Sequence, residues 1–305
     1  MIKVFGHTSP DTDATLSAIA WAWYLTEVRG TPATPFVLGT PNTEAAFLLG
    51  HWGLDAPALL GEIAAGDRVV IVDTNNPAEL PASIDAAEIV EIVDHHRLVG
   101  GLKTAAPITV TIRPLACTAT ILHDRMGTDL ARAPRAIRGA MLSAILSDTL
   151  AFRSPTTTPH DRAVAEALAA DLGVAIPDLA DAMFAAKSDV SAFSDAALLR
   201  MDSKEHEVAG RRLRVSVLET TAPRVLLDRK AGLMAAMPGV AAEDGADEVL
   251  LFIVDILNEE ATLLVPNGVV KAIAEASFPC TVAGDTVVLP GVMSRKKQII
   301  PALTL

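Results

Sequence analysis

A strand-like run passes directly into a polar turn and a helix at the start of the chain, Ile2-Lys3-Val4-Phe5-Gly6-His7-Thr8-Ser9-Pro10-Asp11-Thr12-Asp13-Ala14. Further strands are predicted at residues 68–72, 89–93 and 108–113, because these runs are short, apolar and rich in β-branched residues. Segments with helical periodicity separate them, at 14–28, 43–52, 118–126, 134–151, 159–173 and 177–186. This alternation predicts an α/β fold, with a mainly parallel sheet and helices on both of its faces.

The length of 305 residues exceeds the usual size of a single hydrophobic core, so two domains are expected. A polar stretch, Lys187-Ser188-Asp189-Val190-Ser191, follows the last predicted helix and has the composition of a linker. We predict an N-terminal α/β domain over 1–188, a linker over 189–194 and a smaller C-terminal α/β domain over 195–305. In the latter, strands are predicted at 205–208, 213–218, 249–256, 261–265 and 286–289, and helices at 223–237 and 269–278.

Composition excludes several classes of protein. The formal net charge of −12 disfavours a nucleic-acid-binding surface, because phosphate backbones are bound by basic surfaces. The apolar runs are shorter than the roughly 20 residues of a membrane-spanning helix, so no membrane segment is expected. Cys117 and Cys280 lie far apart, which predicts free thiols rather than a disulfide or a thiolate zinc site. No secretion signal precedes the first strand, and we expect a cytoplasmic protein.

The polar turn after the first strand has the spacing His-x-x-x-Asp-x-Asp. Its ligand-type residues are His7, Asp11 and Asp13, and they follow the carboxyl end of a strand, where open α/β sheets bind ligands. Asp13 alone could equally be a helix cap. A cap does not explain all three residues, so the turn is predicted to face two neighbouring metal ions.

Two more predicted strands end in ligand-type side chains. Asp73 follows a buried apolar run, and its two carboxylate oxygens could bridge two ions. Asp94, His95 and His96 follow the next strand. Because neighbouring side chains on an extended backbone diverge, one histidine is expected to bind metal and the other to face the substrate. Asp94 could ligate as well, or orient a histidine through a hydrogen bond. Each motif alone could also be an ordinary surface turn.

Asp148 lies in Ser147-Asp148-Thr149, inside or at the end of an apolar helix. Burying an ionised carboxylate there is costly unless a cation or several donors meet it. Carboxylates and imidazoles without thiolates favour Mn²⁺, Mg²⁺ or Co²⁺ over a structural zinc. Two such ions about 3.5–4 Å apart are the usual clamp for attack at phosphorus. We therefore predict hydrolysis of a phosphorus–oxygen bond by a metal-bound hydroxide. The predicted metal ligands are His7, Asp11, Asp13, Asp73, His95 and Asp148.

A basic segment near the end of the chain, Ser294-Arg295-Lys296-Lys297, follows Pro290-Gly291. Arginine binds phosphate oxygens in a bidentate fork, and lysine neutralises them as a point charge. This segment therefore indicates that the phosphorus–oxygen bond predicted to be hydrolysed is a phosphoanhydride bond. Lys204, just beyond the expected linker, could close onto the same substrate. A solvated surface patch is the alternative for both.

In their order and spacing, these motifs resemble the family II, manganese-dependent inorganic pyrophosphatases of the DHH phosphoesterase superfamily. The resemblance implies that His7, Asp11 and Asp73 hold one Mn²⁺ ion, and that Asp13, Asp73, His95 and Asp148 hold a second. It implies that pyrophosphate, arriving with additional Mg²⁺, is contacted by His96, Lys204, Arg295 and Lys296, which with the bridging Asp73 are the expected catalytic residues. It further implies a homodimer and an active site in the cleft between the two domains.

Three alternatives remain beside this resemblance. A short-chain polyphosphatase needs the same cations around the same phosphates. A phosphodiesterase of the superfamily carries a glycine-rich, histidine-containing loop in its second domain, and no Gly-Gly-Gly-His run occurs in this sequence. A non-catalytic metal- or phosphate-binding regulator would have lost ligands, whereas every ligand position is filled. The resemblance therefore favours hydrolysis of pyrophosphate.

Overall fold

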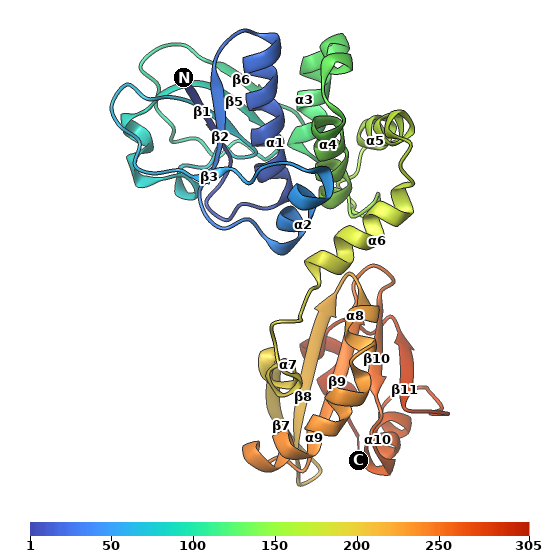
Figure 1. Ribbon diagram of the computed structural model, residues 1–305. Helices are drawn as coiled ribbons and strands as arrows, with labels where there is room; N and C mark the ends of the chain where they lie inside the picture. The colour runs from blue at the N-terminus through green and yellow to red at the C-terminus, as the bar shows by residue number, and fades with distance from the viewer. Residues whose placement is uncertain (305) are drawn as a thin grey trace. The chain divides into compact units, whose positions relative to one another are not determined.

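The computed structural model describes residues 1–304 and divides into two compact units (Figure 1). Unit 1 covers Met1–Lys187, and unit 2 begins at Ser188. Residues 189–194 are turns and irregular backbone. Among the described residues, no helix combines the length and the apolar character needed to cross a membrane.

Unit 1 is built on a six-stranded parallel sheet in the order β3-β2-β1-β4-β5-β6. Its strands are β1 (Ile2–Phe5), β2 (Ala33–Val37), β3 (Ala58–Leu59), β4 (Arg68–Val72), β5 (Glu88–Asp94) and β6 (Thr109–Ile112). β2 and β3 lie on one side of β1, and the chain then crosses over so that β4 lies on the other side of β1. In sheets of this kind, ligands bind beyond the carboxyl ends of the strands where the order reverses. The site is therefore expected beyond β1 and β4.

The prediction of an α/β fold with a parallel sheet is confirmed, but β2 and β3 were not predicted. Pro35 lies within β2, and proline in a run of residues argues against a central strand because it cannot donate to the sheet. β3 has only two residues, which is too short for periodicity to reveal.

The α-helices of unit 1 are α1 (Thr12–Trp23), α2 (Thr43–Trp52), α3 (Thr118–Met126), α4 (Arg135–Asp148), α5 (Pro159–Leu172) and α6 (Ile176–Lys187). A π-helical turn, Tyr24–Val28, continues α1. The helix predicted over 134–151 is too long, because Leu150, Ala151 and Phe152 have φ values of 48°, 49° and 72°. Right-handed helices cannot continue through this left-handed region. Asp148 is consequently the last residue of α4.

Alternate residues of the strands face two different cores. Val4, Val70 and Val72 pack in the larger core, to which α1, α3 and α4 contribute (Figure 1). Val69 and Ile71 belong to a smaller core on the other face, together with Ile84 of a 3₁₀-helix, Ala82–Ala86. The helices expected on both faces are thus long α-helices on one face and short 3₁₀-helices, with loops, on the other.

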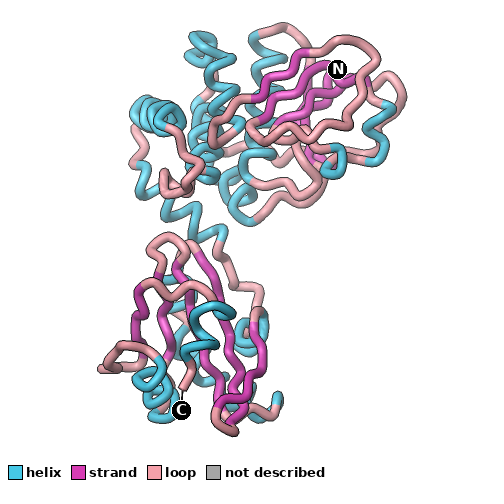
Figure 2. Tube along the Cα trace, turned by 180° about the vertical axis from the view of Figure 1, so that it is seen from behind, coloured by secondary structure: helices cyan, strands magenta, loops and turns pink. Residues whose placement is uncertain are grey.

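Unit 2 contains a five-stranded mixed sheet in the order β11-β10-β9-β8-β7. Figure 2 draws the strands in magenta. Its strands are β7 (Ser203–Val208), β8 (Arg211–Thr220), β9 (Glu248–Asp255), β10 (Glu260–Leu264) and β11 (Thr286–Pro290). β8 and β9 are parallel, and the other pairs are antiparallel. The five predicted strands of this part are confirmed, with ends that differ by a few residues.

The helices of unit 2 are α7 (Asp195–Met201), α8 (Pro223–Leu227), α9 (Lys230–Asp244), α10 (Gly268–Ser277) and α11 (Ile300–Ala302), and a π-helical turn, Arg295–Ile299, precedes the last. The single helix predicted over 223–237 is wrong. The helix is interrupted at Arg229. The guanidinium of Arg229 donates to the Val190 and Phe193 carbonyls and pairs with Asp195. These tertiary contacts hold Arg229 outside the helical conformation, at ψ 2°.

Candidate active site

The carboxyl ends of three neighbouring strands carry the centre of the candidate site. β1 lies beside β4, and β4 lies beside β5. His7 follows β1, Asp73 follows β4 and His95 follows β5. Because parallel neighbours end at the same edge of a sheet, residues that are 22 to 88 positions apart in sequence meet there.

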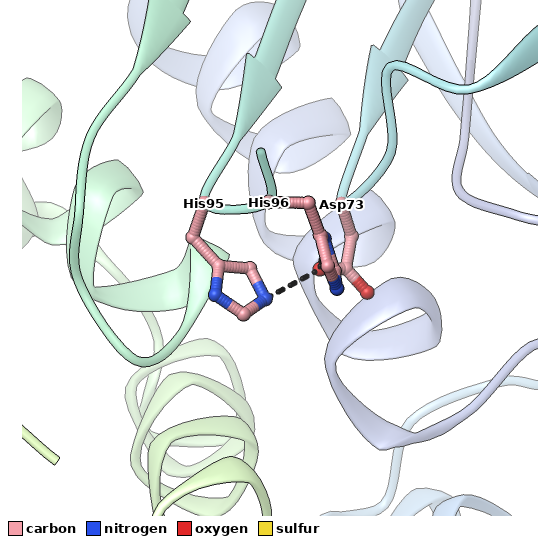
Figure 3. Close-up of side chains that lie close together, drawn as sticks. All are labelled: Asp73, His95 and His96. Carbon is pink, nitrogen blue, oxygen red and sulfur yellow. Dashed lines mark ion pairs between the residues drawn. The ribbon is translucent and has the colours of Figure 1, made fainter. Parts of the chain in front are cut away.

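Asp73 lies at the middle of this edge and is 2 % exposed. Its Oδ2 is 3.5 Å from Nε2 of His7, and its Oδ1 is 3.3 Å from Nε2 of His95 (Figure 3). Thr118 donates its hydroxyl to Oδ1 at 3.1 Å. The backbone of Asp73 is left-handed, with φ 62°, a conformation that aspartate tolerates better than most residues. The two oxygens of Asp73 thus face two different imidazoles, as a bridging ligand requires.

One candidate ligand group consists of His7, Asp11 and Asp73, whose donor atoms lie within 4.8 Å of one another. Asp11 is also the N-cap of α1, since its carboxylate accepts the amide hydrogen of Ala14 at 3.0 Å. Burial opposes protonation of His7, but the hydrogen bonds to Asp11 and Asp73 raise its pKa to about 10. Without a metal ion, protons on imidazole therefore balance the negative charge of this group.

A second candidate group consists of Asp13, Cys117 and Asp148, again within 4.8 Å. Asp13 accepts from the amides of Thr118 at 2.6 Å and Ala119 at 3.2 Å, so it caps α3 and not its own helix. Burial and the charge of Asp73 raise the pKa of Asp13 to about 7. Burial and the charge of Asp13 likewise raise the pKa of Asp148 well above its usual range. Asp13 is buried and the side chain of Asp148 is 19 % exposed, and a cation between such close carboxylates would stabilise their ionised forms.

The prediction of free thiols is confirmed, and Cys117 is fully buried. Its place beside Asp13 and Asp148 was not predicted. The sequence places Cys117 immediately before a predicted helix. Because the free amides of a helix start attract anionic groups, this position could have indicated that carboxylates lie near Cys117.

The two adjacent histidines lie side by side, with ring centroids 4.1 Å apart (Figure 3). The expectation that their side chains diverge is wrong, because β5 ends at Asp94 and both histidines lie beyond the strand, where its alternation of side chains no longer applies. His95 is bonded through Nδ1 to the carbonyl of Leu115 at 3.1 Å, which directs Nε2 towards Asp73. Its ring is 16 % exposed, whereas that of His96 is 53 % exposed.

Asp94 is fully buried and holds His96 in place. Its Oδ1 accepts the backbone amide of His96 at 3.0 Å and lies 2.9 Å from Nδ1 of the same residue. The side-chain amide of Asn75 donates through Nδ2 to Oδ2 of Asp94, and its Oδ1 accepts the backbone amide of Val99 at 2.8 Å. Of the two roles considered for Asp94, the structure shows the hydrogen bond that orients a histidine.

The basic residues predicted to bind phosphate all lie in unit 2. Arg295 begins the π-helical turn before α11. Its Nη1 donates to the carbonyl of Asp202 at 2.8 Å and forms an ion pair with Oδ1 of the same residue, also at 2.8 Å. Lys204, two residues after Asp202, lies in β7 and is exposed. Lys296 is exposed as well. The structure therefore brings Arg295 to the strand that carries Lys204.

Comparison with known proteins agrees with this arrangement. The DHH family N-terminal domain matches residues 1–147, and the DHHA2 domain matches residues 181–305. A probable manganese-dependent inorganic pyrophosphatase of Deinococcus radiodurans is 42% identical over 311 residues, covering 99% of this chain and 98% of the relative. One of Lactobacillus acidophilus is 37% identical over 303 residues, covering 99% and 97%.

A solved structure, described as a putative family II inorganic pyrophosphatase of Methanococcus jannaschii, aligns with a TM-score of 0.59 and 32% identity. The alignment covers 99% of this chain and 98% of that one. The two domains define a protein of the DHH family, and the identity over the full chain shows that this one belongs to the family II inorganic pyrophosphatases.

Proposed function

We propose that this protein hydrolyses inorganic pyrophosphate to two phosphate ions and depends on manganese. The observation that carries the proposal is the position of Asp73, a buried carboxylate with one oxygen near His7 and the other near His95. The family, and relatives named as probable manganese-dependent inorganic pyrophosphatases that match over nearly the whole chain, support pyrophosphate as the substrate and manganese as the metal.

The donor set fits two divalent cations. We propose that His7, Asp11 and Asp73 hold one ion, and that a second is held by Asp13, Asp73, His95 and Asp148. Oxygen and imidazole donors suit Mn²⁺, with Mg²⁺ or Co²⁺ as alternatives. Burial and neighbouring carboxylates raise the pKa values of Asp13 and Asp148, which supports this assignment because a bound cation would favour their ionised forms. When bound, such ions lower the pKa of a water molecule and neutralise phosphate oxygens.

The remaining polar residues are proposed to bind the substrate. His96 is held by Asp94 through Nδ1, which leaves Nε2 of a half-exposed ring able to donate to a phosphate oxygen. Arg295 can grip a phosphate through two guanidinium nitrogens, and Lys204 and Lys296 add positive charge. Additional Mg²⁺ is proposed to arrive with pyrophosphate.

Two further proposals follow from the resemblance. We propose that the protein is cytoplasmic, which its free cysteines support. We also propose that it forms a homodimer. β6 is an edge strand of the sheet in unit 1, and Val110 on it is 51 % exposed, so this edge is open to pairing with a second copy.

The test is an assay of phosphate release with Mn²⁺ or Mg²⁺, using pyrophosphate, tripolyphosphate and a dinucleotide as substrates. We expect rapid release from pyrophosphate with Mn²⁺. Rapid cleavage of the dinucleotide with inert pyrophosphate would overturn the proposal in favour of a phosphodiesterase. Preference for tripolyphosphate would instead identify a short-chain polyphosphatase, and binding of Mn²⁺ without any hydrolysis would identify a regulator.

A further inference from the structure

Glu44 is a buried acidic residue outside the proposed ligand set. It lies in the first turn of α2 and is 0 % exposed. A carboxylate enclosed in this way loses its hydration and has to be compensated by donors or by a countercharge. Neither the proposed metal ligands nor the proposed substrate contacts include Glu44.

One oxygen of Glu44 connects two segments that carry proposed ligands. Its Oε2 accepts the hydroxyl of Thr12 at 2.7 Å and the hydroxyl of Ser147 at 2.6 Å. Thr12 lies between Asp11 and Asp13 at the start of α1, and Ser147 immediately precedes Asp148 at the end of α4. Glu44 thereby ties the start of one ligand-bearing helix to the end of another.

Lys187 places a positive charge near this carboxylate. Nζ of Lys187 lies 3.6 Å from Oε2 of Glu44 and comes from the last turn of α6. Within the described residues, Oε1 of Glu44 has no hydrogen-bond partner. Oε2 is therefore the oxygen of Glu44 that accepts both hydroxyls and faces the lysine.

We propose that Glu44 is a positioning residue that fixes the distance between the Asp13 and Asp148 carboxylates through Thr12 and Ser147, and so keeps the metal centre in a geometry that binds Mn²⁺. The inference rests on the proposed metal assignment. Thr12 directly precedes Asp13 and Ser147 directly precedes Asp148, so the tie through Glu44 opposes separation of the two helix ends. Asp13 is also held by the amides of α3, so the larger effect falls on Asp148.

The test measures Mn²⁺ binding directly, by equilibrium dialysis with detection of free Mn²⁺, and activity separately. Glu44→Met keeps the approximate size and removes the acceptor. We expect at least one of the bound ions to be weakened about 10- to 100-fold, the range found when a partner of a metal ligand is removed. Excess Mn²⁺ should restore most of kcat, because the ligands themselves remain. Glu44→Gln keeps an acceptor oxygen and should lose less affinity.

Two hydroxyl variants test the route of the effect. Thr12→Val combined with Ser147→Ala should reproduce the loss seen in Glu44→Met. Adding both to Glu44→Met should cause little further loss, because residues that act through one another are not additive. If Glu44→Met does not fold, Glu44→Gln and the hydroxyl variants carry the same test.

A matched control is Glu91, a buried carboxylate in the same unit. It accepts from Nε1 of Trp21 at 2.8 Å and pairs with Arg125 at 2.7 Å, and neither contact involves Thr12 or Ser147. Glu91→Met should lower the unfolding temperature and leave Mn²⁺ affinity unchanged. Equal loss of affinity in both variants, or wild-type affinity in Glu44→Met, would overturn the inference. Wild-type protein that binds Mn²⁺ but leaves pyrophosphate intact would overturn only the proposed function.

Discussion

The acidic residues at the centre of the candidate site in unit 1 and the lysines of unit 2 differ in how far their charged groups are buried. Asp13 and Asp73 are 1 % and 2 % exposed and are held by backbone amides, a hydroxyl and imidazoles. Lys204 and Lys296 are exposed side chains on flexible stems. Metal ligands have to be fixed within a few tenths of an ångström, which requires burial and hydrogen bonds. A lysine can neutralise a phosphate from a range of positions.

This difference suggests a division of roles between the units. If unit 1 holds the metal ions, its variants should remove the reaction altogether. If unit 2 binds the phosphates, its variants should weaken the substrate complex and leave the metal ions bound. The three predictions below test this division, in order of expected effect.

The largest effect is expected from Asp73→Ala. This variant removes the carboxylate shared by both proposed ion sites, so Mn²⁺ content should fall and kcat should drop by about 10³-fold or more, at or beyond the upper end of the losses seen when one group that stabilises a transition state is removed. Metal analysis and phosphate release provide the measurement. Normal turnover in the variant would contradict the assignment of Asp73 as a bridging ligand.

A smaller effect is expected from Lys296→Ala. A hydrogen bond to a charged group contributes about 1.5–3 kcal/mol, so KM for pyrophosphate should rise about 10- to 100-fold while Mn²⁺ remains bound. Lys297→Ala is the control, because Lys297 is an exposed neighbour in the same segment with no assigned phosphate contact. Equal increases of KM in the two variants would mean that only the general charge of the segment matters.

The smallest effect concerns the stability of metal-free protein. Burial and the charge of Asp73 raise the pKa of Asp13 to about 7, so the folded protein holds a proton that the unfolded chain loses near pH 4. Hydrogen bonds to Asp73, against the effect of burial, raise the pKa of His95 to about 9. For both groups, folded-state stability falls as pH rises through the folded-state pKa.

The unfolding temperature of metal-free protein should therefore decrease between pH 5 and pH 8. Mn²⁺ replaces these protons, so its stabilising effect should be greater at pH 8, by about 5 °C or more. Calorimetry with EDTA or with saturating Mn²⁺ at both values provides the measurement. An equal increase at pH 5 and pH 8 would show that Asp13 and His95 do not exchange protons for metal.

The strands that carry the centre of the site were predictable because they are short apolar runs with ligand-type residues at their ends. Val69 to Val72 form a continuous buried run, and Asp73 emerges directly after it. β2 escaped prediction because Pro35 interrupts its pattern. The interruption between α8 and α9 was not predicted. Arg229 is held there by carbonyls and by Asp195, and such contacts leave no periodic pattern in the sequence.

The sequence by itself determined the donor types, their places at strand and helix ends, and membership of the family. Local order is sufficient for this, since strand ends and spacings are properties of neighbouring residues. Only the tertiary structure decided that Asp13 caps α3, that His95 and His96 lie side by side, and that Glu44 joins Thr12 to Ser147. The hydrogen bonds of Glu44 span 32 and 103 positions, and that of Asp13 to Ala119 spans 106. Contacts at such separations depend on how the helices and the sheet pack together, which short-range pattern does not encode.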